Sequence, residues 1–183
     1  GDNNVAVGFT SLSANTTGGT NTAIGVSALA ANTTGAWNVA LGAYALDANT
    51  TADSNIAIGG NTLGANTTGT ANVGVGAAAL VTCTGASNNT AVGFTAMNAT
   101  TTGNGATAVG KDALKLNTTG NYAIAIGAWS LAANTTGDNN TAIGTDALKV
   151  NTTADNNTAV GYQSLTANTT GASNVAVGKG ALD

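Results

Sequence analysis

The stretch Ala23–Val39, AIGVSALAANTTGAWNV, decides the fold, because it returns every 17 residues along the chain without an insertion or deletion. Counted from Ala6, the unit occurs about ten and a half times, and the last copy stops after eight residues at Asp183. We number its positions one to seventeen, so that Ala23 is position one and Val39 is position seventeen. Repetition at a fixed period predicts a single array over residues 1–183, without separate domains.

Several positions of the unit keep one residue type in almost every copy. Position three is Gly throughout, as in Gly25 and Gly42, and position two is always Val, Ile or Leu. Position seven is Leu in every copy but one, where Met97 replaces it. Two polar columns stand out, Thr at position eleven and Asn at position sixteen, and in the early copies they are Thr16, Thr33, Thr50, Asn21, Asn38 and Asn55.

The local pattern favours β-structure over helix. Segments such as N-T-A-V-G alternate with a period of two and carry β-branched residues, which is typical of a short strand, and the Gly that follows predicts a bend. The NTTG segment is expected to form a turn or a second short strand. Helical repeats need about 33 residues or more, so a 17-residue unit is too short for one. We therefore predict an all-β fold, a parallel β-solenoid (β-roll) with one coil per repeat.

In such a solenoid, equivalent residues lie about 4.8 Å apart, and eleven coils make a rod roughly 50 Å long. An inward Asn can then exchange amide hydrogen bonds with the Asn of the coils above and below, which satisfies buried polar groups and fixes the register. A Thr column does the same more weakly. We interpret the Asn, Thr and Gly columns as structural ladders, with a ligand-binding array as the alternative.

The two faces of the predicted strand differ in size. Positions seventeen and two, such as Val39 and Leu41, share one face, and position one, which is Ala in ten of eleven copies, lies on the other. We expect one face to fill the coil and the smooth Ala face to pack against a neighbouring chain. The chain starts and stops within a repeat, so we expect either a longer parent protein or a subunit that continues the stack.

The composition excludes several classes of function. Only 7% of residues are charged, the net charge is −4, and the chain has no His, Arg, Glu or Pro. Without a basic patch, nucleic acid is not an expected partner, and no apolar run reaches the ~20 residues of a membrane-spanning helix. The absence of His removes a Ser-His-Asp or Cys-His arrangement, and the Asp residues stand singly. We expect no enzyme, no cofactor and no metal site, and Cys83 alone cannot form an internal disulfide.

Aromatic residues occupy variable positions of the unit and are the candidates for contact with a partner or a glycan. Exposed Trp and Tyr suit sugar stacking or protein contact. The alternative is that they fill grooves between associated chains. The candidates are Trp37, Tyr44, Tyr122, Trp129 and Tyr162.

The pentapeptides NVAVG, NTAIG and NIAIG, at Asn4–Gly8, Asn21–Gly25 and Asn55–Gly59, resemble the repeats of YadA-like head domains in trimeric autotransporter adhesins. Similar arrays with interleaved NTTG occur in phage tail-fibre proteins. The resemblance covers the whole chain and implies a left-handed β-roll that forms a homotrimer on a cell surface or a virion. Coils of the adhesin heads are often shorter than the 17 residues found here.

Together these observations predict a non-enzymatic, extracellular fibre segment of an adhesin, a phage tail fibre or a self-assembling filament. Self-association, as a homotrimer or end to end, is expected, and a cell-surface glycan or receptor is a possible partner. The alternative is an ice-binding β-solenoid, which needs a flat and regular Thr ladder such as the column from Thr16 to Thr169. Against it, a T-x-T pair is missing, because position thirteen is Gly or Ala.

Overall fold

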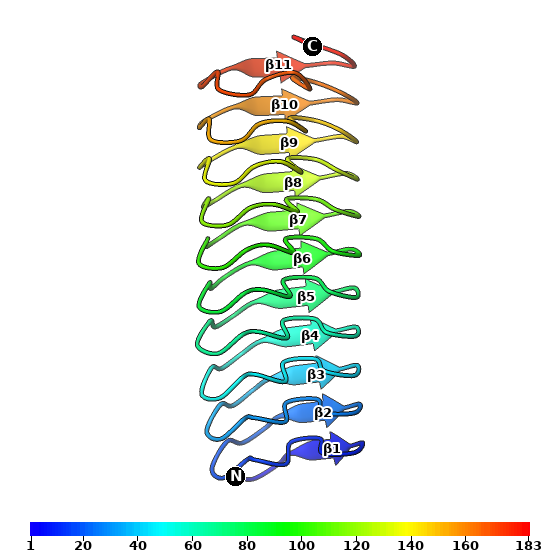
Figure 1. The fold of residues 1–183 in the computed structure, drawn as a ribbon, viewed down its shortest axis with the longest axis vertical. Coiled ribbons are helices and arrows are strands. Elements are labelled where there is room, and N and C mark those ends of the chain that lie inside the picture. The colour runs from blue at the N-terminus through cyan, green and yellow to red at the C-terminus, as the bar shows by residue number, and fades with distance from the viewer.

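Each 17-residue unit forms one coil with one three-residue strand, and the eleven strands make a single parallel sheet (Figure 1). The computed structural model describes residues 1–183, so the predicted all-β solenoid is confirmed. It contains no helix of the length and apolar character that crossing a membrane requires. The strands are β1 Val5–Val7, β2 Thr22–Ile24, β3 Val39–Leu41, β4 Ile56–Ile58, β5 Val73–Val75, β6 Thr90–Val92, β7 Thr107–Val109, β8 Ile124–Ile126, β9 Thr141–Ile143, β10 Thr158–Val160 and β11 Val175–Val177.

Each strand pairs with the strand of the next repeat, and the paired residues are 17 apart in the sequence. Val5 lies opposite Thr22 and Ala6 opposite Ala23, and the same shift of 17 joins every later pair. The NTTG segment forms a bend and contains no second strand. Equivalent residues therefore lie above one another along the whole rod.

Glycine at position three ends each strand for a steric reason. Gly25 has a φ of +137°, and a Cβ built on it would lie 2.5 Å from the carbonyl oxygen of Gly42 in the next coil. Such a contact is shorter than any Cβ tolerates, and the backbone conformation is one that L side chains rarely adopt. The chain can turn this tightly between stacked coils only where position three lacks a side chain.

The apolar part of each coil's interior consists of small residues and one large residue at position seven, which is Leu in every coil except that of Met97. Position seven is fully buried from Leu29 to Leu148, and it packs with position one and position six, which are mostly Ala. Position seven has a φ near +50° in every coil, as in Leu29. This left-handed conformation costs roughly 1–2 kcal/mol, and burial of the Leu side chain, worth about 1.5–3 kcal/mol, offsets it.

The prediction that the smooth Ala face packs against a neighbouring chain is wrong, because the Ala side chains point into the interior of the coils. Ala23 and Ala40 are fully buried, whereas the larger side chains at positions seventeen and two point outward. The reason is the thinness of the coil. A Cβ at position one of β5 would already be in van der Waals contact with Leu63 Cδ1, at 3.6 Å, which leaves little room for a larger side chain.

The single departure from Ala at position one shows how tight this packing is. Gly74 stands there in β5, and a Cβ at this residue would lie 2.6 Å from Thr62 Cγ2. Thr62 occupies position six, where other coils carry Ala or Ser, and its hydroxyl donates to the Gly76 carbonyl oxygen at 2.7 Å. The extra methyl group of Thr62 and the missing methyl group of Gly74 thus compensate each other.

We predict that Gly74→Ala destabilises the protein by about 1–3 kcal/mol, the usual cost of overpacking, and that adding Thr62→Ala restores most of the loss. Urea unfolding of the two single variants and the double variant forms a double-mutant cycle that measures this coupling. Strictly additive effects would show that the two side chains do not compete for one space.

Candidate functional site

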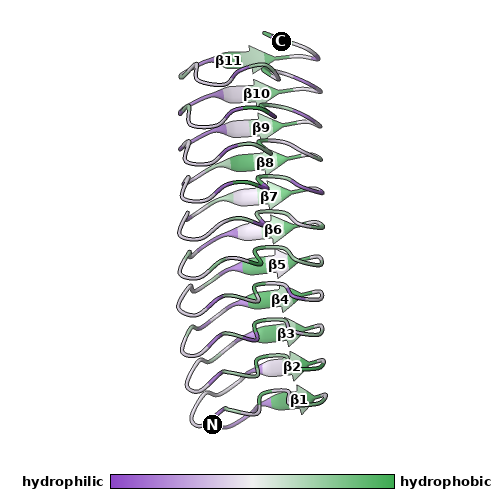
Figure 2. Ribbon diagram, viewed as in Figure 1, coloured by the Kyte–Doolittle hydropathy of each residue, from purple (hydrophilic) through white to green (hydrophobic).

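The outward face of the sheet holds more of the exposed large hydrophobic residues than any other part of the coil. It consists of positions seventeen and two of all eleven strands, and we call it the sheet face. Position two contributes eleven aliphatic residues, and position seventeen contributes six aliphatic residues and five Thr. None of these side chains is buried, and Ile24 and Leu41, for example, are 36% and 44% exposed. Figure 2 shows the strands in one column, green in β3, β4 and β8 and paler in strands that begin with Thr, such as β6 and β7, with a hydrophilic segment before each strand.

The sheet face carries no charge, and its geometry is regular because the strands are in register. Its hydrophobic residues have no covering element within the chain, since the whole remainder of each coil lies on the opposite side of the strand. Such a surface suits contact with another flat apolar surface, and it offers no group for acid–base or nucleophilic chemistry.

The two Thr columns of the NTTG bend differ in what their hydroxyl groups do. At position eleven the hydroxyl group of eight of the ten Thr residues donates to the carbonyl oxygen of the next Thr in the column, as from Thr16 to Thr33 at 2.9 Å and from Thr33 to Thr50 at 3.0 Å. At position twelve the Thr residues, such as Thr34 and Thr51, are exposed. The position-twelve column therefore presents free hydroxyl groups along the rod, whereas most hydroxyl groups at position eleven are engaged within the chain.

The Asn column at position sixteen lies inside the rod. Asn21, Asn38 and Asn55 are fully buried. The amide oxygen of Asn21 accepts from the backbone N–H of Asn38 at 2.9 Å, and the Nδ2 of Asn38 lies 3.2 Å from the same oxygen. A buried group whose bonds are filled within the chain has no capacity left for a ligand, so this column is out of reach of partners.

The five candidate aromatic residues do not form one site. Trp37 and Tyr122 share position fifteen, and they are 62% and 66% exposed but five coils apart. Tyr44 stands alone, and Tyr162 has the Lys179 ammonium 5.9 Å from its ring centre. The structure thus distributes these rings along the rod.

Trp129 belongs to a compact charged cluster that the sequence analysis did not identify. The ammonium groups of Lys111 and Lys149 lie 5.3 Å and 5.6 Å from its ring centre, and its Nε1 donates to Asp112 Oδ2 at 3.2 Å. Lys115 lies 3.0 Å from the same carboxylate. Three of the four lysines of the chain meet here, because positions four, five and eight of adjacent coils converge. Only the stacking of residues 17 apart could have revealed this cluster from the sequence.

Asp112 is the most constrained charge in the cluster. Burial opposes its ionisation, but hydrogen bonds from Thr95 and Lys115 outweigh burial, so that the pKa of Asp112 is lowered from its ordinary value. The charges of the two nearby lysines act in the same direction. The carboxylate is therefore ionised at neutral pH and already fully engaged.

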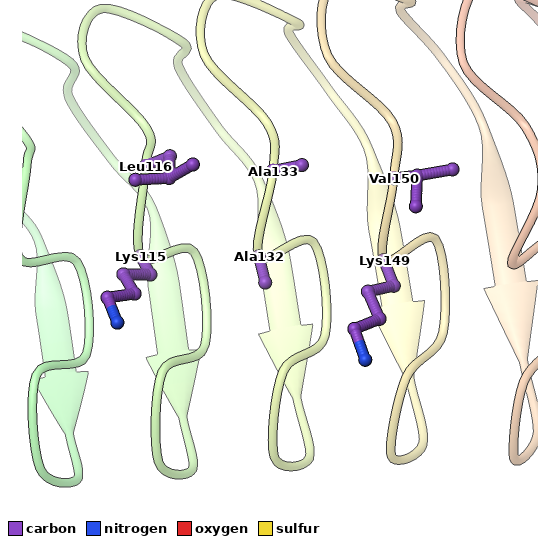
Figure 3. A pocket seen from close by; sticks show the side chains of 6 residues that line it. All are labelled: Lys115, Leu116, Ala132, Ala133, Lys149 and Val150. Carbon is purple, nitrogen blue, oxygen red and sulfur yellow. The ribbon is translucent and has the colours of Figure 1, made fainter.

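Beside this cluster lies an open notch of about 290 Å³. Figure 3 shows the short side chains of Ala132 and Ala133 between the larger ones of the coils on either side, Leu116 and Val150 among them. The two lysines on its edge pair with carboxylates, Lys115 with Asp112 at 3.0 Å and Lys149 with Asp146 at 2.9 Å. The notch therefore offers apolar surface without a free charge to select an anion.

Clusters of metal ligands and the single cysteine are the remaining features of chemical interest. No three His, Cys, Asp or Glu side chains group as metal ligands. Cys83 is fully buried at position ten, and burial raises the pKa of its thiol to about 11, so the reactive thiolate is scarce at neutral pH.

No protein-family model, no curated protein and no solved structure matches this chain. The sheet face, which repeats in register along eleven strands, is therefore the surface from which a function is inferred.

We predict that Asp112→Asn lowers the unfolding free energy at pH 7 by about 1–3 kcal/mol, because charged hydrogen-bond donors lose their partner. Since the folded-state pKa is lowered, ionised Asp112 stabilises the fold above the unfolded pKa, and this contribution disappears as pH falls through the folded value. Urea unfolding at pH 7 and pH 2 should therefore show a smaller acid effect in Asp112→Asn than in the parent. Asp2→Asn, at an exposed carboxylate, is the matched control, and equal acid effects in all three proteins would contradict the assignment.

Proposed function

We infer that the chain is a stiff, non-enzymatic fibre segment whose copies associate through the sheet face. The observation that carries this proposal is the uncovered, uncharged row of aliphatic residues on eleven in-register strands. The resemblance to YadA-like adhesin heads and phage tail fibres supports a homotrimer in an extracellular adhesin or a virion fibre, with end-to-end filaments as the other arrangement.

The size of the face is suited to association. Eleven strands about 4.8 Å apart, each three residues wide, make a strip roughly 50 Å by 10 Å. A footprint on the order of 500 Å² lies within the range at which exposed apolar patches mark contact sites. This footprint is smaller than the ~800 Å² that each partner buries in a standard protein interface.

The shape of the face favours a small closed assembly. Because it is long, flat and narrow, three copies with parallel axes can turn their strips toward one central line and cover all of them. The constant strand spacing lets side chains of one copy fit between those of the next along the entire length, as in stacked β-sheets. The exposed rings of Trp37, Tyr44 and Tyr122 then remain available for a glycan or a protein receptor.

We predict that the purified chain sediments as an oligomer, three chains being the expected mass, and that Ile126→Asp with Ile143→Asp weakens association at least 100-fold. Burial of two unpaired carboxylates in an apolar interface is strongly unfavourable in free energy, whereas on the surface of a single chain they stay hydrated. Sedimentation over a concentration series measures both, and circular dichroism confirms that the β-fold is retained.

The matched control is Thr119→Asp with Thr136→Asp, which adds the same charge at exposed position twelve and should leave the mass unchanged. Should the first variant not fold, Ile56→Thr with Ile124→Thr replaces it, because Thr occupies position seventeen in five other coils. A parent chain that stays monomeric at high concentration would overturn the proposal.

An ice-binding function is the second candidate, and the exposed Thr column at position twelve is the observation that favours it. Nine of its ten members are Thr, with Gly85 as the interruption, and they repeat about every 4.8 Å. Thermal hysteresis of the purified chain tests this function. We predict none, because the neighbouring hydroxyl groups at position eleven are bound to backbone carbonyls; hysteresis that Thr119→Asp with Thr136→Asp abolishes would instead establish ice binding.

A further inference from the structure

Two buried columns of Asn amides converge on one column of carbonyl groups, at position thirteen. In an intact coil the Gly35 carbonyl oxygen accepts from Asn32 Nδ2 at 3.0 Å and from Asn21 Nδ2 at 2.8 Å. Asn32 stands at position ten of the same coil, and Asn21 at position sixteen before it. The same double acceptance occurs at Ala52 and Gly69. These amides tie each coil to the next inside the rod.

Both columns are interrupted in the middle of the chain, and the interruptions are next to each other. Position ten is Cys83 and then Thr100, and position sixteen is Ala106 and then Ala123. Four consecutive carbonyls at position thirteen each lose an Asn donor as a result. The amides that remain reach Ala86 at 2.8 Å, Gly103 at 2.8 Å, Gly120 at 2.9 Å and Gly137 at 3.0 Å.

The interruptions are offset, so that no carbonyl of this column loses both donors. The Gly103 carbonyl lacks a bond from Thr100 but still accepts from Asn89 Nδ2. The Gly120 carbonyl has no donor at Ala106 but still accepts from Asn117 Nδ2. At Ala86 the Cys83 thiol gives only a weak contact, with Sγ 3.7 Å from the oxygen. The segment therefore remains folded with about half of its internal amide bonds to these carbonyls.

Other buried groups in this segment lose their partners altogether. Thr100 Oγ1 has no hydrogen bond. In intact coils the backbone N–H at position sixteen donates to the Asn of the coil before, but Ala123 and Asn140 follow alanines and make no such bond. Both residues are fully buried. A buried polar group without a partner weakens the fold substantially.

A second ladder on the outside spans the same coils. At position fourteen the backbone N–H of one coil donates to the side chain of the next, from Ser87 to Asn104 at 2.7 Å and from Asn104 to Asn121 at 2.9 Å. It continues through Asp138 and Asp155, each accepting at 2.7 Å. These bonds are only partly buried, so water competes with them more than with the interior ladder.

We propose that residues 83–140 form a compliant joint in an otherwise stiff rod, where stacked coils separate locally while those on both sides stay closed. In a linear array each coil contacts only its neighbours, so the weakest interface decides where the stack opens. In residues 83–140 the coils are held together by two interrupted Asn columns and the outer ladder at position fourteen. Elsewhere in the rod both Asn columns are complete. The proposal concerns the inside of one chain and is independent of how copies associate.

Native-state hydrogen exchange of the full chain, read by peptide mass spectrometry, tests the joint. Backbone amides of residues 91–140 should exchange at least tenfold faster than their equivalents in residues 23–72. The triple variant Thr100→Asn, Ala106→Asn and Ala123→Asn restores the Asn column at position sixteen completely and the column at position ten except at Cys83. It should slow exchange in residues 91–140 at least tenfold.

The matched control places a second copy of the defect elsewhere. Asn32→Thr, Asn38→Ala and Asn55→Ala reproduce the same offset pattern four coils earlier, because Gly35, Ala52 and Gly69 each keep one Asn donor, and should bring fast exchange to residues 23–72. Uniform protection along the parent chain would overturn the joint, and this measurement stands even where a triple variant does not fold. Unchanged exchange in a folded repair variant would overturn the role of the missing amides.

Discussion

The hydrogen bonding of buried Asn amides to the backbone of the next coil is the interaction on which the rest of the structure depends. An inward Asn at position sixteen supplies an oxygen to the backbone of the next coil and an N–H to a carbonyl at position thirteen, as Asn21 does for Asn38 and Gly35. Both bonds need coils of equal length, since a shift of one residue would leave amide and carbonyl unpaired in the interior. The constant period of 17 is therefore an energetic requirement of a thin rod whose aliphatic core is one Leu and a few Ala per coil.

The same thinness explains the outer surface. With so little space inside, the larger aliphatic residues of the strands have to point outward, and the sheet face arises as a by-product of a small core. A soluble single chain would place polar residues there; this chain places Val, Ile, Leu and Thr, such as Leu41 and Thr22. We regard the thin rod and its apolar sheet face as two consequences of one packing constraint. For this reason a fibre segment that associates through the sheet face is the function best supported.

Sequence reasoning predicted the fold well because every column repeats. The strand at Thr22–Ile24, the bend at Gly25 and the 17-residue register follow from local patterns that ten further copies reinforce. It placed the strand faces wrongly, because alternation says which residues share a face but not which face is inside. That choice depends on the space left by Leu63 and Thr62 across the coil, a tertiary quantity. The cluster around Trp129 was missed for a related reason, since its members stand in three different columns and meet only once the stacking is known.

A distance measurement between two distant coils tests the stacked register most directly. Thr34 and Thr136 are exposed at position twelve and lie 102 residues, or six repeats, apart. Spin labels at these two sites, in a Cys83→Asn background and diluted with unlabelled chain, should report one narrow distribution, for a Cα separation of about 29 Å at six coil spacings. A broad distribution, or a mean far from that value, would contradict a stack in which residues 17 apart lie above one another.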